Sequence, residues 1–102
     1  MIAETPTFVK PMEDKEVIAG GSIVLECMAG GSPRPQLSWS KNGSPLLATE
    51  RHFFTAENQL LIIVNTEQSD AGSYECEINN SLGKKRGASI LSVKEGEQIF
   101  YD

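Results

Sequence analysis

The sequence predicts an all-β sandwich built from two antiparallel sheets, and three observations support this prediction. Short runs of alternating apolar and polar residues are separated by turn residues roughly every ten positions, which is typical of antiparallel strands. No segment sustains the 3.6-residue apolar period of a helix. The 102 residues, 39% hydrophobic and 23% charged, have the size and composition of one globular domain.

The first third of the chain predicts a broken edge strand and then a buried strand. Two prolines interrupt residues 5–21, and proline confines a strand to a sheet edge because it has no N–H to donate. Residues 30–35, GGSPRP, are expected to form a stiff polar loop. Between them, alternation along residues 22–29 places three residues on the inner face: Ile23, Leu25 and Cys27.

The middle of the chain predicts a hairpin and two more strands. Residues 36–41, QLSWSK, point Leu37 and Trp39 inward and end in Asn42-Gly43, a dipeptide that favours a tight hairpin because both residues tolerate positive φ. Two further strands are expected at residues 51–55, RHFFT, and 58–64, NQLLIIV. The second has Leu61 and Ile63 in phase for burial.

The last third predicts a hairpin of two strands. Alternation after Gly72 places Tyr74, Cys76 and Ile78 inward. Residues 80–87, NSLGKKRG, are expected to form a short turn before a final strand at residues 88–93. That strand completes the inner face with Leu91 and Val93.

The two cysteines leave two interpretations open. An even pair in a small domain is compatible with one disulfide in an oxidising compartment, and two buried free thiols are the alternative. A catalytic cysteine would need a base and an exposed thiolate. His52 is the single histidine, and no motif links it to either cysteine.

The spacing of the cysteines resembles the immunoglobulin fold. Trp39 follows Cys27 by 12 positions, and Tyr74 precedes Cys76 by two. In that fold an inter-sheet disulfide packs on a buried tryptophan, within sheets joined by Greek-key connections. With SPRPQLSW before the tryptophan and NNSLG after Cys76, residues 6–94 resemble an I-set immunoglobulin domain. Residues 1–5 are then an N-terminal extension and residues 95–102 a linker.

This resemblance implies roles for several residues. Cys27 and Cys76 would form the disulfide, and the Tyr74 hydroxyl would turn back to the backbone near Asp70 as a tyrosine corner. Gly72 would allow a tight turn, and we expect Asp70 to pair with Arg51 through charge-assisted hydrogen bonds. One position departs from the I-set pattern, because it is commonly apolar there: Thr66.

Three segments, TERHFF, NQLLIIV and NNSLG, are similar to the last, membrane-proximal immunoglobulin domain of the Lrig proteins (leucine-rich repeats and immunoglobulin-like domains). Those are single-pass membrane glycoproteins. The resemblance implies an extracellular module of a plasma-membrane protein that modulates growth-factor receptor signalling and binds protein partners such as receptor ectodomains. The alternatives are a structural I-set module of an intracellular muscle or cytoskeletal protein and a passive ectodomain spacer.

Charge and motifs argue against other classes of protein. A net charge of −5 and a pI near 4.8 disfavour nucleic-acid binding. The longest apolar run, residues 60–64, is too short to cross a bilayer, and we expect no signal peptide in this stretch. Glu13, Asp14 and His52 lack the spacing of metal ligands, and no catalytic or cofactor motif occurs. We therefore predict a non-enzymatic domain without cofactor or metal.

Two acceptor sequons predict glycosylation if the protein is secreted. They lie at Asn42-Gly43-Ser44 and Asn79-Asn80-Ser81. The first is followed by Pro45, and Asn42 already has a structural reason to be in its turn.

Two further features have both a structural and a functional interpretation. The run Lys84-Lys85-Arg86 is either a solvated hairpin tip or a patch that steers an acidic partner. Phe53 and Phe54 point to opposite faces of their strand, so that one of them either packs at the sheet edge or contributes an interface aromatic.

Overall fold

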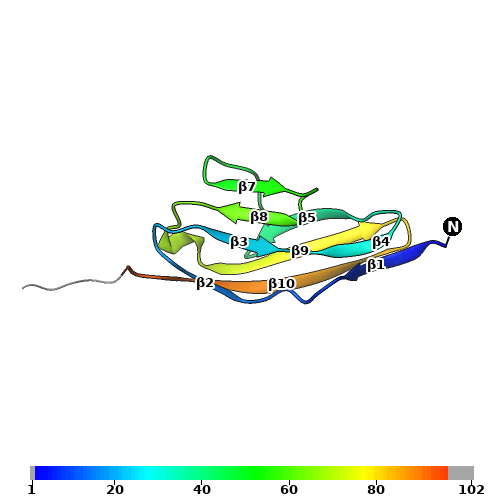
Figure 1. The fold of residues 1–102 in the computed structure, drawn as a ribbon, viewed down its shortest axis with the longest axis horizontal. Coiled ribbons are helices and arrows are strands. Elements are labelled where there is room, and N and C mark those ends of the chain that lie inside the picture. The colour runs from blue at the N-terminus through cyan, green and yellow to red at the C-terminus, as the bar shows by residue number, and fades with distance from the viewer. Residues whose placement is uncertain (1, 97–102) are drawn as a thin grey trace, which may run out of the picture.

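A computed structural model describes residues 2–96 of the chain, so residues 97–102 of the predicted linker lie outside the described part. The fold is a β-sandwich, as predicted, and Figure 1 shows its strands in two layers. The strands are β1 (Glu4–Phe8), β2 (Lys15–Ile18), β3 (Ile23–Glu26), β4 (Ala29–Ser32), β5 (Gln36–Lys41), β6 (Ser44–Pro45), β7 (His52–Thr55), β8 (Leu60–Ile63), β9 (Gly72–Asn80) and β10 (Gly83–Lys94). One short 3₁₀ turn, η1 (Gln68–Asp70), precedes β9.

One layer is a five-stranded sheet in the order β2-β10-β9-β5-β6. The other holds the three-stranded sheet β3-β8-β7, and the two-stranded sheet β1-β4 continues from it, since β4 follows β3 along the chain. Neighbours such as β3 with β8 and β5 with β9 are far apart in sequence, as Greek-key connections require. The expectation of purely antiparallel sheets is wrong for one pair, because β2 runs parallel to β10.

The proline-broken first strand forms two edge strands. Among the described strands, β1 pairs with β4 alone and β2 with β10 alone, so that one strand contributes to each layer. β1 begins at Glu4, inside the predicted N-terminal extension.

The loop predicted at residues 30–35 is shorter in the structure, because residues 30–32 belong to β4. A Cβ on Gly31, whose φ is +150°, would lie 3.3 Å from the Cα of Pro6 and 3.1 Å from the ring of Pro35. The missing side chain therefore allows β1 to approach β4 closely.

The predicted turn at residues 80–87 is also shorter. β10 begins at Gly83, so that Lys84, Lys85 and Arg86 are strand residues opposite Asn79, Ile78 and Glu77 of β9. The chain reverses at Ser81-Leu82. Pairing with the long strand β9 extends the ladder beyond the point where the sequence alone predicts its end.

The core lies between the two layers. Its fully buried members are Leu25, Cys27, Leu61, Ile63, Tyr74, Cys76, Ile78 and Leu91, and Trp39 is 5% exposed. Thr66 is buried too, and its hydroxyl donates a hydrogen bond of 3.3 Å to the carbonyl of Ile18. This bond satisfies the polar group at a position where an apolar residue is usual.

Candidate functional site

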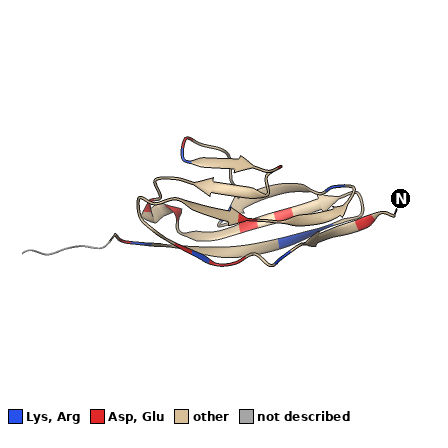
Figure 2. Ribbon diagram, viewed as in Figure 1, with Lys and Arg blue, Asp and Glu red and all other residues tan. Residues whose placement is uncertain are grey.

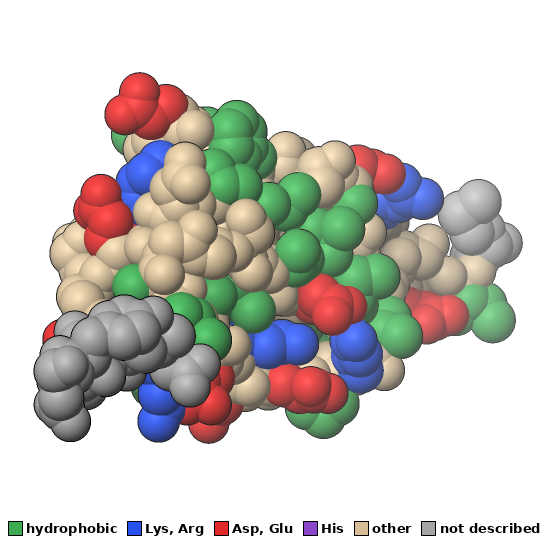
Figure 3. Space-filling model, turned by 60° about the vertical axis from the view of Figure 1, so that its left-hand side comes forward, with side chains coloured by type: hydrophobic (Ala, Val, Ile, Leu, Met, Phe, Trp, Pro, Cys, Tyr) green, Lys and Arg blue, Asp and Glu red, His purple; other side chains and the backbone are tan. Residues whose placement is uncertain are grey.

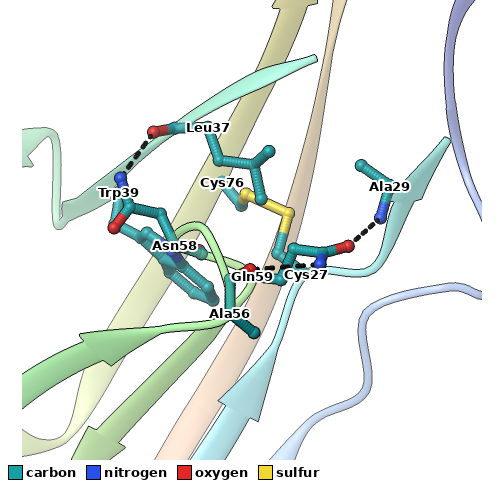
Figure 4. The surroundings of a disulfide bond; sticks show 8 residues. All are labelled: Cys27, Ala29, Leu37, Trp39, Ala56, Asn58, Gln59 and Cys76. Carbon is teal, nitrogen blue, oxygen red and sulfur yellow. Dashed lines mark hydrogen bonds between the residues drawn. A yellow bond between two sulfur atoms is a disulfide. The ribbon is translucent and has the colours of Figure 1, made fainter. Parts of the chain in front are cut away.

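The disulfide joins the two layers at the centre of the core. Cys27, just after β3, bonds to Cys76 in β9 with a Cα–Cα distance of 6.4 Å, and both side chains are fully buried. Trp39 of β5 is the register partner of Cys76, which places the indole beside the sulfurs (Figure 4). The core at this point is apolar and contains no free thiol among the described residues.

Trp39 also anchors the turn between β7 and β8. Its Nε1 donates to the carbonyl of Asn58 at 2.6 Å, and the Asn58 amide donates to the carbonyl of Leu37 at 3.4 Å. Ala56, Glu57 and Asn58 all have positive φ, a conformation that costs roughly 1 kcal/mol or more for each non-glycine residue. The bonds from Trp39 and Asn58 hold this unfavourable turn in place.

The tyrosine corner lies at one end of β9. The buried Tyr74 hydroxyl donates to the carbonyl of Asp70 at 2.6 Å, and burial raises the pKa of Tyr74 to about 12. Gly72, with φ +152°, starts the strand. A Cβ there would lie 2.9 Å from the amide atoms of Asn42, so a side chain at this position would collide with the β5–β6 turn.

Asp70 is the centre of a buried polar cluster next to this corner. Arg51 donates to its carboxylate from Nη1 at 2.8 Å and from Nη2 at 3.0 Å, and the backbone N–H of Glu67 adds a bond of 2.7 Å. Burial acts to raise the pKa of Asp70, but the hydrogen bonds from Arg51 and Glu67 outweigh it and lower that pKa. The carboxylate therefore stays charged although the residue is only 3% exposed.

His52 belongs to this cluster, and sequence reasoning did not place it there. Its Nε2 lies 3.5 Å from the Asp70 carboxylate, and its Nδ1 lies 2.7 Å from the hydroxyl of Thr49. Burial lowers the pKa of His52, with Asp70 acting in the opposite direction. Only the pairing of β7 with β8 brings His52 level with the Arg51–Asp70 pair, and no local motif indicates this.

The order Thr49, His52, Asp70 has the residue types of a nucleophile, a base and an acid. The Thr49 oxygen, however, accepts the backbone N–H groups of Arg51 and His52, each at 3.0 Å. Both lone pairs of the hydroxyl are thus engaged, and the oxygen is not free to attack a substrate. The cluster is suited to fixing the loop before β7, not to catalysis.

The basic run is a continuous stretch of β10 (Figure 2), but its side chains do not form one patch. Successive strand residues point to opposite faces, so Lys84 and Arg86 share a face that Lys85 does not. Glu77 faces both, at 3.0 Å from Arg86 and 4.0 Å from Lys84. Part of the positive charge is therefore neutralised within the domain.

The two phenylalanines of β7 are on opposite faces. Phe53 is 46% exposed on the outer face, whereas Phe54 is half-buried and packs against the core.

The two sequon asparagines have different surroundings. Asn42 is exposed, with φ 49°, and its side-chain oxygen accepts the N–H of Ser73 at 3.0 Å. Asn79 is half-buried on β9. Its neighbour Asn80 donates to the carbonyls of Glu4 and Pro33 and so ties the N-terminal strand to the β4–β5 loop.

Residues 2–96 hold no cluster of three or more side chains suited to binding a metal ion. Within the same residues, no helix has the length and hydrophobicity to cross a membrane.

Comparison with known families decides the classification. Residues 6–93 match the family described as Immunoglobulin I-set domain. The chain belongs to this family. Domains of the I-set family are generally non-catalytic and commonly mediate contacts between proteins.

Within the I-set family, the chain is similar to domains of much longer proteins. It is 56% identical over 92 residues to leucine-rich repeats and immunoglobulin-like domains protein 3 of Homo sapiens and of Mus musculus. It is 55% identical to leucine-rich repeats and immunoglobulin-like domains protein 2 of Homo sapiens. Each alignment covers 90% of this chain but only 8% or 9% of the relative, so the chain spans less than a tenth of these proteins.

Solved structures of other proteins have the same architecture. The titin M3 domain superposes with a TM-score of 0.84 at 28% identity, over 89% of this chain and 98% of that one. Extracellular domains 3–5 of Drosophila OTK give a TM-score of 0.82 at 38% identity, over 90% of this chain and 32% of that one.

Proposed function

We propose that this I-set domain is a non-catalytic, extracellular protein-interaction module of a single-pass membrane glycoprotein that modulates growth-factor receptor signalling. The observation that carries the proposal is the 56% identity to leucine-rich repeats and immunoglobulin-like domains protein 3 over 90% of the chain. The buried Cys27–Cys76 disulfide supports an oxidising compartment. The domain would act through surface complementarity, with receptor ectodomains as the class of partner.

The test is a domain exchange in the human relative. The 92-residue segment that matches this chain is replaced by the chain itself, or by the titin M3 domain as a spacer of the same fold. We expect the first replacement to keep the relative's association with growth-factor receptors and its surface level. The second should reduce receptor association, as measured by co-precipitation and receptor phosphorylation.

The same exchange separates active binding from passive spacing. If the titin domain preserves receptor association as well as this chain does, the module is a spacer and the proposal is wrong. A spacer has one observation in its favour, the close superposition on titin M3. A thiol count on oxidised protein tests the intracellular form of that alternative, because two free thiols would favour it.

We also propose that Asn79 carries an N-linked glycan more readily than Asn42. The Asn42 side chain accepts a hydrogen bond from Ser73 and packs where Gly72 leaves room, whereas the Asn79 side chain makes no hydrogen bond within residues 2–96. Mass spectrometry of protein secreted from mammalian cells should show higher occupancy at Asn79. Equal or reversed occupancy would contradict this assignment.

A further inference from the structure

The outer face of the three-stranded sheet departs from the pattern of a solvated sheet. In an antiparallel sandwich the inner residues of a strand are apolar and the outer ones polar. β9 follows this rule, with Ser73, Glu75 and Glu77 alternating with buried residues. The outward residues around β8 are instead all aliphatic: Leu60, Ile62 and Val64.

The apolar residues of the neighbouring strands are in register with them. Val24 of β3 and Phe53 of β7 are both cross-strand partners of Ile62, and they are 39% and 46% exposed. Val24, Ile62 and Phe53 thus form one row across three strands, and we call this the apolar row. Figure 3 shows a band of hydrophobic side chains on this face. The continuous sequence LLIIV is the pattern of a strand covered on both faces.

We propose that the apolar row is a homotypic contact at which a second copy of this domain packs face to face. A two-fold axis that lies in the interface parallel to β8 places Phe53 of each copy over Val24 of the other. Ile62 then lies against Ile62. Because the large side chain meets the small one on both sides, the row is complementary to itself.

Charges around the apolar row permit this arrangement. In the next row, Glu26 of one copy faces Thr55 of the other, and Leu60 faces Leu60. Glu26 is already paired with Lys10 at 3.0 Å, so no two like charges oppose each other. Both sequons lie on the five-stranded sheet, and a glycan at either one would leave the apolar row uncovered.

The area of the face sets the strength of the contact. Three strands about 4.8 Å apart, with four residues each at about 3.4 Å, present roughly 200 Å². A stable interface buries about 800 Å² per partner. Association of the free domain should therefore be weak, with a dissociation constant on the order of 1 mM. This inference does not depend on receptor modulation and can hold or fail independently of it.

Dilution of the oxidised domain followed by NMR tests the proposal. Between about 1 mM and about 20 µM, amide shifts should change on β3, β7 and β8 and stay constant on the five-stranded sheet. A filtered nuclear Overhauser spectrum of mixed labelled and unlabelled protein should connect the Phe53 ring with the Val24 methyl groups. Phe53→Thr and Ile62→Thr should each weaken association at least about tenfold.

Controls come from exposed apolar residues elsewhere. Ile90→Thr on β10 and Leu47→Thr before β7 change residues that are 48% and 75% exposed, and neither should alter association. If Ile62→Thr does not fold, Phe53→Thr alone remains decisive, since threonine is a good strand residue at an edge.

Concentration-independent shifts would overturn the proposal, as would dilution shifts confined to the five-stranded sheet. Shifts on the apolar row that appear only when a different protein is added would also overturn it, because the occupant would then not be a second copy.

Discussion

Two regions hold the layers of this domain together, and they work by opposite means. The disulfide region, Cys27–Cys76 with Trp39, is covalent and apolar and lies in the middle of the core. The Asp70 cluster, with Arg51, His52 and Tyr74, is polar and lies at the end of the core from which β9 starts. The first should be insensitive to pH, whereas the second depends on the charge of each member.

This difference shows how a small sandwich can be fixed at two points. A disulfide constrains the unfolded chain and does not need precise polar partners. A buried carboxylate is stabilising only while all its donors are present, because an unpaired buried charge is costly. Substitution should therefore separate the regions by size of effect and by pH dependence.

The largest effect is expected in the disulfide region. A double change, Cys27→Ala with Cys76→Ala, should lower the free energy of unfolding by about 4 kcal/mol on the chain-entropy model for a loop of 49 residues. That is a large share of the roughly 5–15 kcal/mol typical of small domains. Urea denaturation with the oxidised parent as reference measures it. A loss below about 1 kcal/mol would mean that packing alone holds the layers together.

Asp70→Ala should be next, with a loss of about 3 kcal/mol. The change leaves the Arg51 guanidinium without its bidentate partner and the Glu67 N–H without an acceptor. Glu67→Gln is the matched control, because Glu67 is exposed and 3.5 Å from Arg51, and it should cost less than about 0.5 kcal/mol. Equal losses for the two variants would show that Asp70 is no anchor.

Tyr74→Phe isolates one bond of the same region and should cost about 1 kcal/mol. The ring still fills its buried site, but the carbonyl of Asp70 loses the donor at 2.6 Å. Chemical denaturation at neutral pH measures the change. A loss as small as that of a typical surface substitution would indicate that the ring, and not the hydroxyl, makes the corner.

The smallest expected effect is the loss of stability on acidification to just below neutral pH. This loss should come from the Asp70 cluster and not from the disulfide region. Burial lowers the pKa of folded His52 below its ordinary 6.5, so the unfolded chain binds this proton more readily. The contribution of neutral His52 to the free energy of unfolding is therefore fully present above pH 6.5. It is lost as the pH falls from 6.5 to the pKa of His52 in the folded protein. Urea midpoints at about pH 7.5 and about pH 5 should differ in the parent and differ less in His52→Gln.

The Asp70 carboxyl should add a second loss at lower pH. Its pKa in the folded protein is below the ordinary 3.8, so its contribution is present above 3.8 and is lost as the pH falls through the folded-state value. Asp70→Ala should remove this second loss. If Asp70→Ala loses stability over the same acidic range as the parent, other carboxyl groups are responsible for this second loss.

Sequence patterns, together with the resemblance to the I-set pattern, predicted much of the disulfide region and part of the Asp70 cluster. Two cysteines allow a single intramolecular bond, and alternation places Tyr74 and Cys76 on one face. The pair Arg51–Asp70 could be expected from the resemblance to the I-set pattern. His52 could not, because its place in the cluster depends on which residue of β8 it faces.

Errors in the predicted elements have one cause. The extent of β4 and the parallel pairing of β2 depend on contacts with strands distant in sequence, and the start of β10 depends on its pairing with β9 across the hairpin. Gly30 and Gly31 suggest a loop by composition, yet they form a strand because β1 lies against them. Turn propensity is local, and a hydrogen-bonded neighbour can override it.

By itself, the sequence pattern determined the class of fold and which strand residues face inward, because alternation is a local property of a strand. The resemblance to the I-set pattern implied the covalent bond and the tyrosine corner. Only the tertiary structure decided that His52 joins Asp70 and that Val24, Ile62 and Phe53 form one row. Val24 lies 38 positions before Ile62 and His52 lies 18 positions before Asp70, so tertiary packing, and not local sequence, brings them together. Cross-strand register is a collective result of packing, so no single segment encodes it.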